Sequence, residues 1–143
     1  MKLRLGLVLF ILSAFFLLGM GNMDQTEKAG EIPVPDKEIS AVVNDIEGQI
    51  LNLTHFSING QTYLTGKLGA GQAAIPLDQI RLIALSVEPK GLAARVELDD
   101  RSQIHLIMEK GTQIYGKMKI GTYKVSLDRL KKIEILGVKE RKK

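Results

Sequence analysis

The chain contains no cysteine and no tryptophan, and only two of its 143 residues, His55 and His105, are histidines. Without cysteine the protein has no disulfide, no zinc–thiolate site, no thiol nucleophile and no attachment point for a lipoprotein anchor. Its stability must therefore come from an ordinary apolar core. No nucleophile-elbow sequence surrounds any serine, so we expect neither a hydrolytic triad nor an enzyme.

Aromatic residues are also scarce, at 5% of the chain, and the excess of basic residues is small, with 20 Lys and Arg against 16 Asp and Glu. Binding of single-stranded nucleic acid needs a basic groove with stacking aromatic residues, and binding of a duplex needs a basic face. We therefore expect no nucleic-acid partner. The short stretch Gly69-Ala70-Gly71 does not precede a helical pattern, so it does not predict a nucleotide loop, and we expect no cofactor.

The N-terminus has the features of an export signal. Lys2 and Arg4 precede an uncharged, mostly apolar run over residues 5–20, and Gly19-Met20-Gly21 supplies a small-x-small end. We predict a signal helix over residues 1–21, cleaved after Gly21. A membrane-spanning helix needs roughly 20 apolar residues, so the shorter run favours cleavage, with an uncleaved anchor as the alternative. The predicted location is periplasmic or secreted. If the anchor is kept, the protein is held at the inner membrane with the rest of the chain facing outward.

Two polar segments flank the predicted folded body. Residues 22–38 include Pro33 and Pro35 and predict a flexible linker. Residues 137–143 form a basic tail, which we interpret as solvated, with attraction to an anionic membrane surface as the alternative. Contact with a membrane is therefore expected only through an uncleaved N-terminal segment or through this tail.

The body contains an internal repeat at an offset of 50 residues. Residues 62–85 and 112–135 share seven identities, among them Gly66/Gly116 and Lys67/Lys117, where roughly one or two are expected by chance. Upstream, the same offset relates His55 to His105. The repeat predicts two units, residues 39–87 and 88–136.

Each unit alternates apolar and polar residues with the period of two that is typical of antiparallel strands. Turn signals separate the strands: Asn59-Gly60, residues 99–102, and a Leu-Asp-x-(Ile/Leu) step at 77–80 and 127–130. The predicted fold class is all-β, with two tandem five-stranded SH3-like units. A single ten-strand β-sandwich is the alternative.

The repeated pattern of Gly-x-apolar followed by apolar-x-Leu-Asp-x-apolar covers residues 47–136. It resembles short repeated β-modules in uncharacterised exported bacterial proteins. The resemblance implies an architecture and no particular activity.

Few residues are candidates for chemistry. His55 and His105 are weak candidates for a metal site, because two imidazoles in matching places could share an ion. The carboxylates of Asp99 and Asp100 are adjacent in a predicted turn, so we interpret them as turn residues rather than as an acid–base pair. No residue is predicted to bind a ligand.

These observations predict an exported, non-catalytic binding or scaffolding module of the cell envelope. The alternative is a metal-binding or weakly catalytic envelope protein that uses His55 and His105. Leu51 and Leu53 lie on the opposite strand face from Phe56 and Ile58, which suggests a second buried face. We therefore expect a protein partner or a homo-oligomer.

Overall fold

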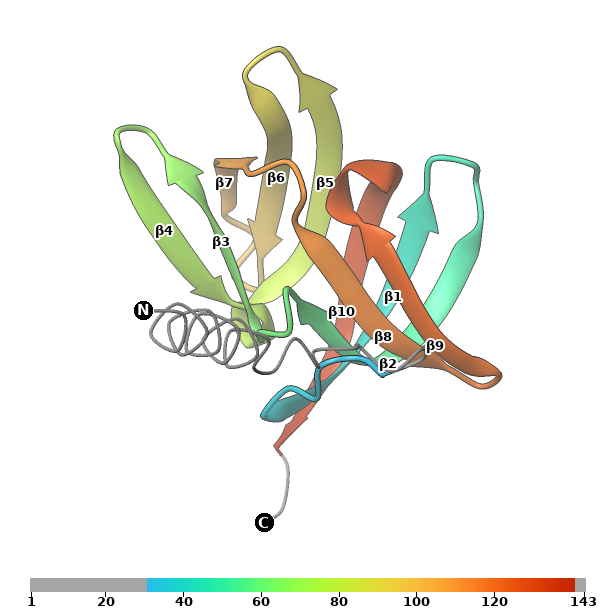
Figure 1. Cartoon of the computed structure of the whole chain (residues 1–143). Coiled ribbons are helices and arrows are strands. Elements are labelled where there is room, and N and C mark those ends of the chain that lie inside the picture. Colours follow the sequence, from blue (N-terminus) through green and yellow to red (C-terminus); the bar gives the residue numbers. More distant parts are fainter. Residues whose placement is uncertain (1–30, 141–143) are drawn as a thin grey trace, which may run out of the picture.

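The computed structural model describes residues 31–140 of the chain (Figure 1). The predicted signal helix with its cleavage site at Gly21 lies outside the described residues, as do residues 141–143. Within the described part, no helix is long and apolar enough to cross a membrane. The strands are β1 (Lys37–Asp45), β2 (Ile50–Ile58), β3 (Tyr63–Leu68), β4 (Gly71–Pro76), β5 (Ile80–Glu88), β6 (Gly91–Leu98), β7 (Gln103–Met108), β8 (Gln113–Met118), β9 (Gly121–Ser126) and β10 (Leu130–Glu140).

The described residues form an all-β protein, as the alternation in the sequence predicts. Its ten strands make one open antiparallel sheet in the order β4-β3-β7-β6-β5-β10-β1-β2-β8-β9. This arrangement differs from two tandem five-stranded units, because strands of the first half (β1–β5) pair with strands of the second half (β6–β10) at five places: β3–β7, β5–β6, β5–β10, β1–β10 and β2–β8. In Figure 1 the β3–β4 hairpin lies at one side of the sheet and the β8–β9 hairpin at the other.

The two halves exchange hairpins. The β3–β4 hairpin of the first half pairs with β7 of the second, and the β8–β9 hairpin of the second half pairs with β2 of the first. The predicted turn at Asn59-Gly60 is present, with positive φ at both residues, but it closes only one isolated bridge, between Ile58 and Gln61. Beyond that bridge the chain crosses to the other half of the sheet. The turn is therefore a connector between the two halves and not a hairpin.

Strands five places apart in the chain are counterparts, from β1 and β6 to β5 and β10. When each strand in the sheet order is replaced by its counterpart, the result is the same order read from the other end. The centre of this symmetry lies between β5 and β10, where Ile83 is directly opposite its counterpart Ile133. Both side chains are completely buried. The sheet therefore has an approximate twofold axis at this pair.

The correspondence between the halves has two offsets. Counterparts in β3–β5 and β8–β10 lie 50 residues apart, as the repeat predicts. In β1 and β2 the offset is 53, because the opposed pair Ala41 and Leu53 matches the opposed pair Ala94 and Leu106.

One of the three residues by which the offset changes is added at a β-bulge in β2. Pairing of β2 with β8 shifts register between Thr54 and Ser57, and His55 within the bulge has a φ of +50°. The extension of the 50-residue offset to the two histidines is therefore wrong. His105 lies opposite Arg95 on β6, and Asn52 lies opposite Val42 on β1. Because Arg95 and Val42 are counterparts at the offset of 53, the counterpart of His105 is Asn52.

The same bulge explains the apparent second face of β2. It reverses the alternation of side chains, so Leu53 and Phe56 both join the single hydrophobic core of the described residues. Leu51 also packs against this core. The pattern that suggested a second buried face therefore reflects the bulge.

The two segments that flank the body are more ordered than predicted where the structure describes them. Pro35 is buried, β1 begins at Lys37, and β10 runs to Glu140 opposite Lys37. The prediction of a solvated tail is therefore wrong for residues 137–140, which form strand pairs with β1. Val138, the one apolar residue of the predicted tail 137–143, lies opposite the buried Ile39 of β1.

The Leu-Asp-x-(Ile/Leu) steps form short 3₁₀ turns that lead into β5 and β10, as predicted. Equivalent hydrogen bonds support them: the amide of Leu77 donates to the carbonyl of Thr62, and the amide of Leu127 donates to that of Thr112. The side chain of Asp78 does not cap its own turn but accepts a hydrogen bond from Lys37 Nζ at 2.9 Å.

Candidate functional site: a lysine-lined groove

The structure contains an open groove of about 610 Å³. This volume lies within the range of small-molecule sites. Three lysines line it: Lys67, Lys90 and Lys110. The exchange of hairpins creates the groove, because β3 of the first half carries Lys67 directly opposite Ile107 on β7 of the second half.

Each lysine comes from a different element. Lys67 lies on β3, Lys90 in the turn between β5 and β6, and Lys110 in the connector from β7 to β8. The turn at Lys90 is followed by Gly91, whose φ of +138° favours glycine and whose missing side chain leaves room beside Ile107.

The base of the groove is formed by close packing of β3 on β7. A Cβ atom at Gly66 would lie 3.0 Å from the Cβ of Leu106 and 3.2 Å from the Sδ of Met108. Met108 is buried, whereas Ile107 is partly exposed. The groove therefore has a narrow apolar base and a cationic rim.

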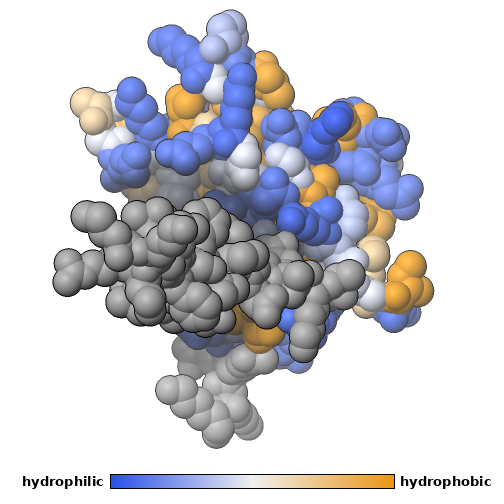
Figure 2. All heavy atoms as spheres, viewed as in Figure 1, coloured by the Kyte–Doolittle hydropathy of each residue, from blue (hydrophilic) through white to orange (hydrophobic). Residues whose placement is uncertain are grey.

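The three lysines give the groove an excess of positive charge. All three are exposed, and none forms an ion pair with a described residue. Glu109 is the only acidic residue that lines the groove, as far as residues 31–140 are concerned. Figure 2 shows hydrophilic and hydrophobic residues side by side over the ends of the β3–β4 and β5–β6 hairpins, which border the groove.

Hydrogen-bonding groups accompany the charges. Asn59, Thr65 and Gln72 also line the groove, and they offer hydroxyl and amide groups. Ammonium groups with neutral donors nearby are suited to carboxylate or phosphate groups. The groove can therefore hold an anionic ligand. It was not predicted from the sequence, because its lysines come together only through the exchange of hairpins. The identity of Lys67 with Lys117 in the repeat was the only signal on the chain.

The two histidines lie far from each other in the sheet order, and neither lines the groove. His105 on β7 and His55 on β2 have four strands between them. His105 is exposed and opposite Arg95, and His55 lies in the bulge with its Nδ1 3.3 Å from Thr54 Oγ1. No group of three or more His, Asp or Glu side chains within residues 31–140 could hold a metal ion.

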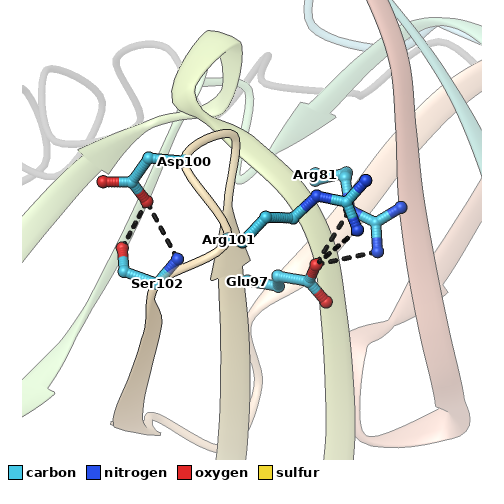
Figure 3. Close-up of polar contacts among 5 residues, drawn as sticks. All are labelled: Arg81, Glu97, Asp100, Arg101 and Ser102. Atoms are coloured by element: carbon cyan, nitrogen blue, oxygen red, sulfur yellow. Dashed lines mark hydrogen bonds and ion pairs between the residues drawn. The ribbon is translucent and has the colours of Figure 1, made fainter.

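The carboxylates of Asp99 and Asp100 lie in the β6–β7 turn, as predicted. Asp100 Oδ1 accepts hydrogen bonds from the amide and the hydroxyl of Ser102, and these bonds lower the pKa of Asp100 (Figure 3). Arg101 has a φ of +72° at the place where the equivalent turn of the first half has Gly48. Asp100 is therefore a turn-stabilising residue.

Glu97 binds two arginines beside the same turn (Figure 3). Its Oε1 lies 2.8 Å from an Nη of Arg81 on β5 and 3.7 Å from an Nη of Arg101. The side chain of Glu97 is only 17% exposed, which makes this the least solvated ion pair among the described residues. The cluster joins β5, β6 and the turn, and its one carboxylate faces two guanidinium groups.

The pKa of Tyr123 is raised, although this residue does not line the groove. Burial of its ring raises the pKa, and the negative charge of Asp45 raises it further. Tyr123 packs against the core from β9, the outermost strand, so it belongs to the structural framework and not to the groove.

The structure defines the chain as an all-β protein with one open ten-stranded antiparallel sheet. Residues 35–138 match the model of a family described as "Uncharacterised protein", and the chain belongs to that family. No curated protein and no solved structure matches the chain. The residues matched by the family model begin at the buried Pro35 and end within β10, so they cover almost the whole sheet.

Proposed function

We propose that the protein is an exported, non-catalytic binding module of the cell envelope whose lysine-lined groove takes an anionic ligand. The observation that carries the proposal is the meeting of Lys67, Lys90 and Lys110, from three elements, around one groove without acidic partners of their own. An exposed ion pair contributes roughly 0.2–1 kcal/mol, so three together support a moderate affinity that falls with added salt.

Binding of labelled poly-L-glutamate, measured by fluorescence anisotropy at low salt, tests the groove. The triple substitution K67Q/K90Q/K110Q should weaken binding about tenfold, which corresponds to about 1.4 kcal/mol. The matched control is K119Q/K131Q/K132Q, which removes the same charge from exposed lysines outside the groove. Binding should change less than about twofold in that control. Equal losses in both variants would show that only the net charge matters and would overturn the groove assignment.

Export is the second part of the proposal and rests on the basic, apolar and small-residue pattern of residues 1–21. N-terminal sequencing of the protein from an envelope fraction should begin at Asn22. An intact N-terminus in the membrane fraction would support the anchored alternative, and recovery in the cytoplasm would contradict export.

We also propose that the body arose from duplication of one five-stranded SH3-like unit. The palindromic strand order and the equivalent hydrogen bonds at Leu77 and Leu127 support this. Residues 31–88 contain β1 to β5, and they lack β7, with which the β3–β4 hairpin pairs. Expressed alone, this segment should form a symmetric dimer by light scattering, whereas a stably folded monomer would contradict the proposal.

A further inference from the structure

The two ends of the sheet differ in how their outer edges are protected. β4 lies at one end and pairs only with β3, and β9 lies at the other end and pairs only with β8 (Figure 1). The outward amide and carbonyl groups of both strands therefore have no strand partner within residues 31–140. Exposed edges of this kind invite pairing with another strand, and proteins commonly block them with lysine.

β9 carries that protection and β4 does not. Lys124 is exposed on β9, with its Nζ 5.7 Å from the ring centre of Tyr115. The counterpart of Lys124 on β4 is Ala74, which is also exposed. No charged residue occurs between Lys67 and Asp78, so the whole of β4 and its turn are neutral.

A neutral edge of small residues is suited to pairing with a copy of itself. Around a twofold axis, a charge at the axis would face the same charge on the copy, and like charges directly opposite destabilise a sheet. β4 has no such charge, and its side chains offer no complementary group that would recognise an unrelated charged strand. Ala73 and Ala74 also leave the edge open to close approach of another backbone.

The centre of the molecule already contains a junction of this kind. β5 and β10 are counterparts, and they pair antiparallel with Ile83 directly opposite Ile133. The charged residues beside this pair, Lys132 and Glu134, lie opposite Ala84 and Leu82. This sheet therefore joins equivalent strands where neutral residues meet at the axis and no charge faces a like charge.

We propose that β4 pairs antiparallel with β4 of a second copy and so joins two ten-stranded sheets edge to edge. β4 has only six residues, so the contact is small, and small interfaces of this kind are weak or transient. The expected association is a reversible dimer with a dissociation constant between about 1 μM and 1 mM. This inference does not depend on the ligand of the groove.

Sedimentation velocity over a concentration series tests the dimer, with protein purified after export from cells that express the full chain. A74K copies the lysine of β9 onto β4 and should raise the dissociation constant at least about tenfold. The matched control T122K adds the same charge at an exposed position of β9 and should leave it unchanged within about twofold. Q72K is a second β4 variant that should act like A74K, and circular dichroism confirms that each variant is folded.

Amide hydrogen exchange locates the contact. Amides of β4 should exchange more slowly as the protein concentration rises, and those of β9 should not. The proposal is overturned if the unmodified protein stays monomeric at about 1 mM, if A74K and T122K weaken association equally, or if the concentration-dependent protection falls on β9.

Discussion

The glycines at the two exchanged hairpins provide a sharp test of the packing. Gly66 on β3 and Gly116 on β8 are counterparts, and each has a residue of the opposite half against it. A Cβ atom at Gly66 would lie 3.0 Å from the Cβ of Leu106, and one at Gly116 would lie 2.9 Å from the Cβ of Leu53. These neighbouring atoms are attached directly to the backbone, so relief requires the strands to move apart.

Substitution of either glycine by alanine should therefore destabilise the fold. Overpacking of a close-packed interior typically costs about 1–3 kcal/mol in the free energy of unfolding. With a urea m-value of roughly 1–3 kcal/mol/M for a small domain, the midpoint of unfolding should fall by about 1 M in G66A and in G116A. The slope of the transition should stay unchanged, since the folded and unfolded states keep the same exposed surface.

The matched control is G71A in the β3–β4 hairpin. The nearest atom to a Cβ at Gly71 would be the carbonyl oxygen of Leu68, at 3.9 Å, and Gly71 has no positive φ. Alanine there should leave stability unchanged or raise it by roughly 0.5–1 kcal/mol. The reasoning fails if G66A and G116A unfold at the same urea concentration as G71A.

Three further substitutions test local contacts. Ser57 is completely buried and its hydroxyl has no hydrogen-bond partner within residues 31–140, so S57A should raise the free energy of unfolding by about 1 kcal/mol in a thermal melt, and a loss would contradict this. Asn59 Oδ1 accepts a hydrogen bond from the amide of Gln113, 2.8 Å away, so N59A should cost about 1–2 kcal/mol in urea unfolding while N59D retains the acceptor. Hydrogen bonds from Ser102 lower the pKa of Asp100, so they stabilise the fold above pH 3.8, and this stabilisation is lost as the pH falls through the folded pKa. The difference in free energy of unfolding between wild type and S102A should therefore close in acid, and a constant difference would contradict this.

Much of the architecture was predictable because the relevant interactions are local. Alternation of apolar residues predicts strands wherever one face is buried, and the turn at residues 99–102 and the Leu-Asp steps follow from short-range turn chemistry. These features depend on residues within a few positions of one another, and the structure confirms them.

The pairing of the strands could not be read in the same way. Asn59-Gly60 forms the turn its residues favour, but whether the next strand folds back on β2 or crosses to β7 depends on contacts such as Gly66 on Leu106, 40 residues apart. The bulge at His55 likewise depends on β8. A fixed offset in the sequence does not reveal three residues added between Leu53 and Tyr63, so His55 and His105 were wrongly matched.

The candidate site was hidden for the same reason. Lys67, Lys90 and Lys110 are unremarkable on the chain, because exposed lysines are common and no short motif links them. They line one groove only because the β3–β4 hairpin pairs with β7.

The exchange of hairpins is the central claim, because both the groove and the neutral edge strand depend on it. The absence of native cysteine allows it to be tested by disulfide formation in double-cysteine variants. Opposed residues of antiparallel strands have Cα atoms about 4.5–5.5 Å apart, within the range that a disulfide spans. We predict that K67C/I107C, and its counterpart T54C/K117C, form intramolecular disulfides under mild oxidation, detected by peptide mass mapping. Efficient bridging in T54C/K67C, which joins β2 to β3 within one half, with none in K67C/I107C, would contradict the exchange.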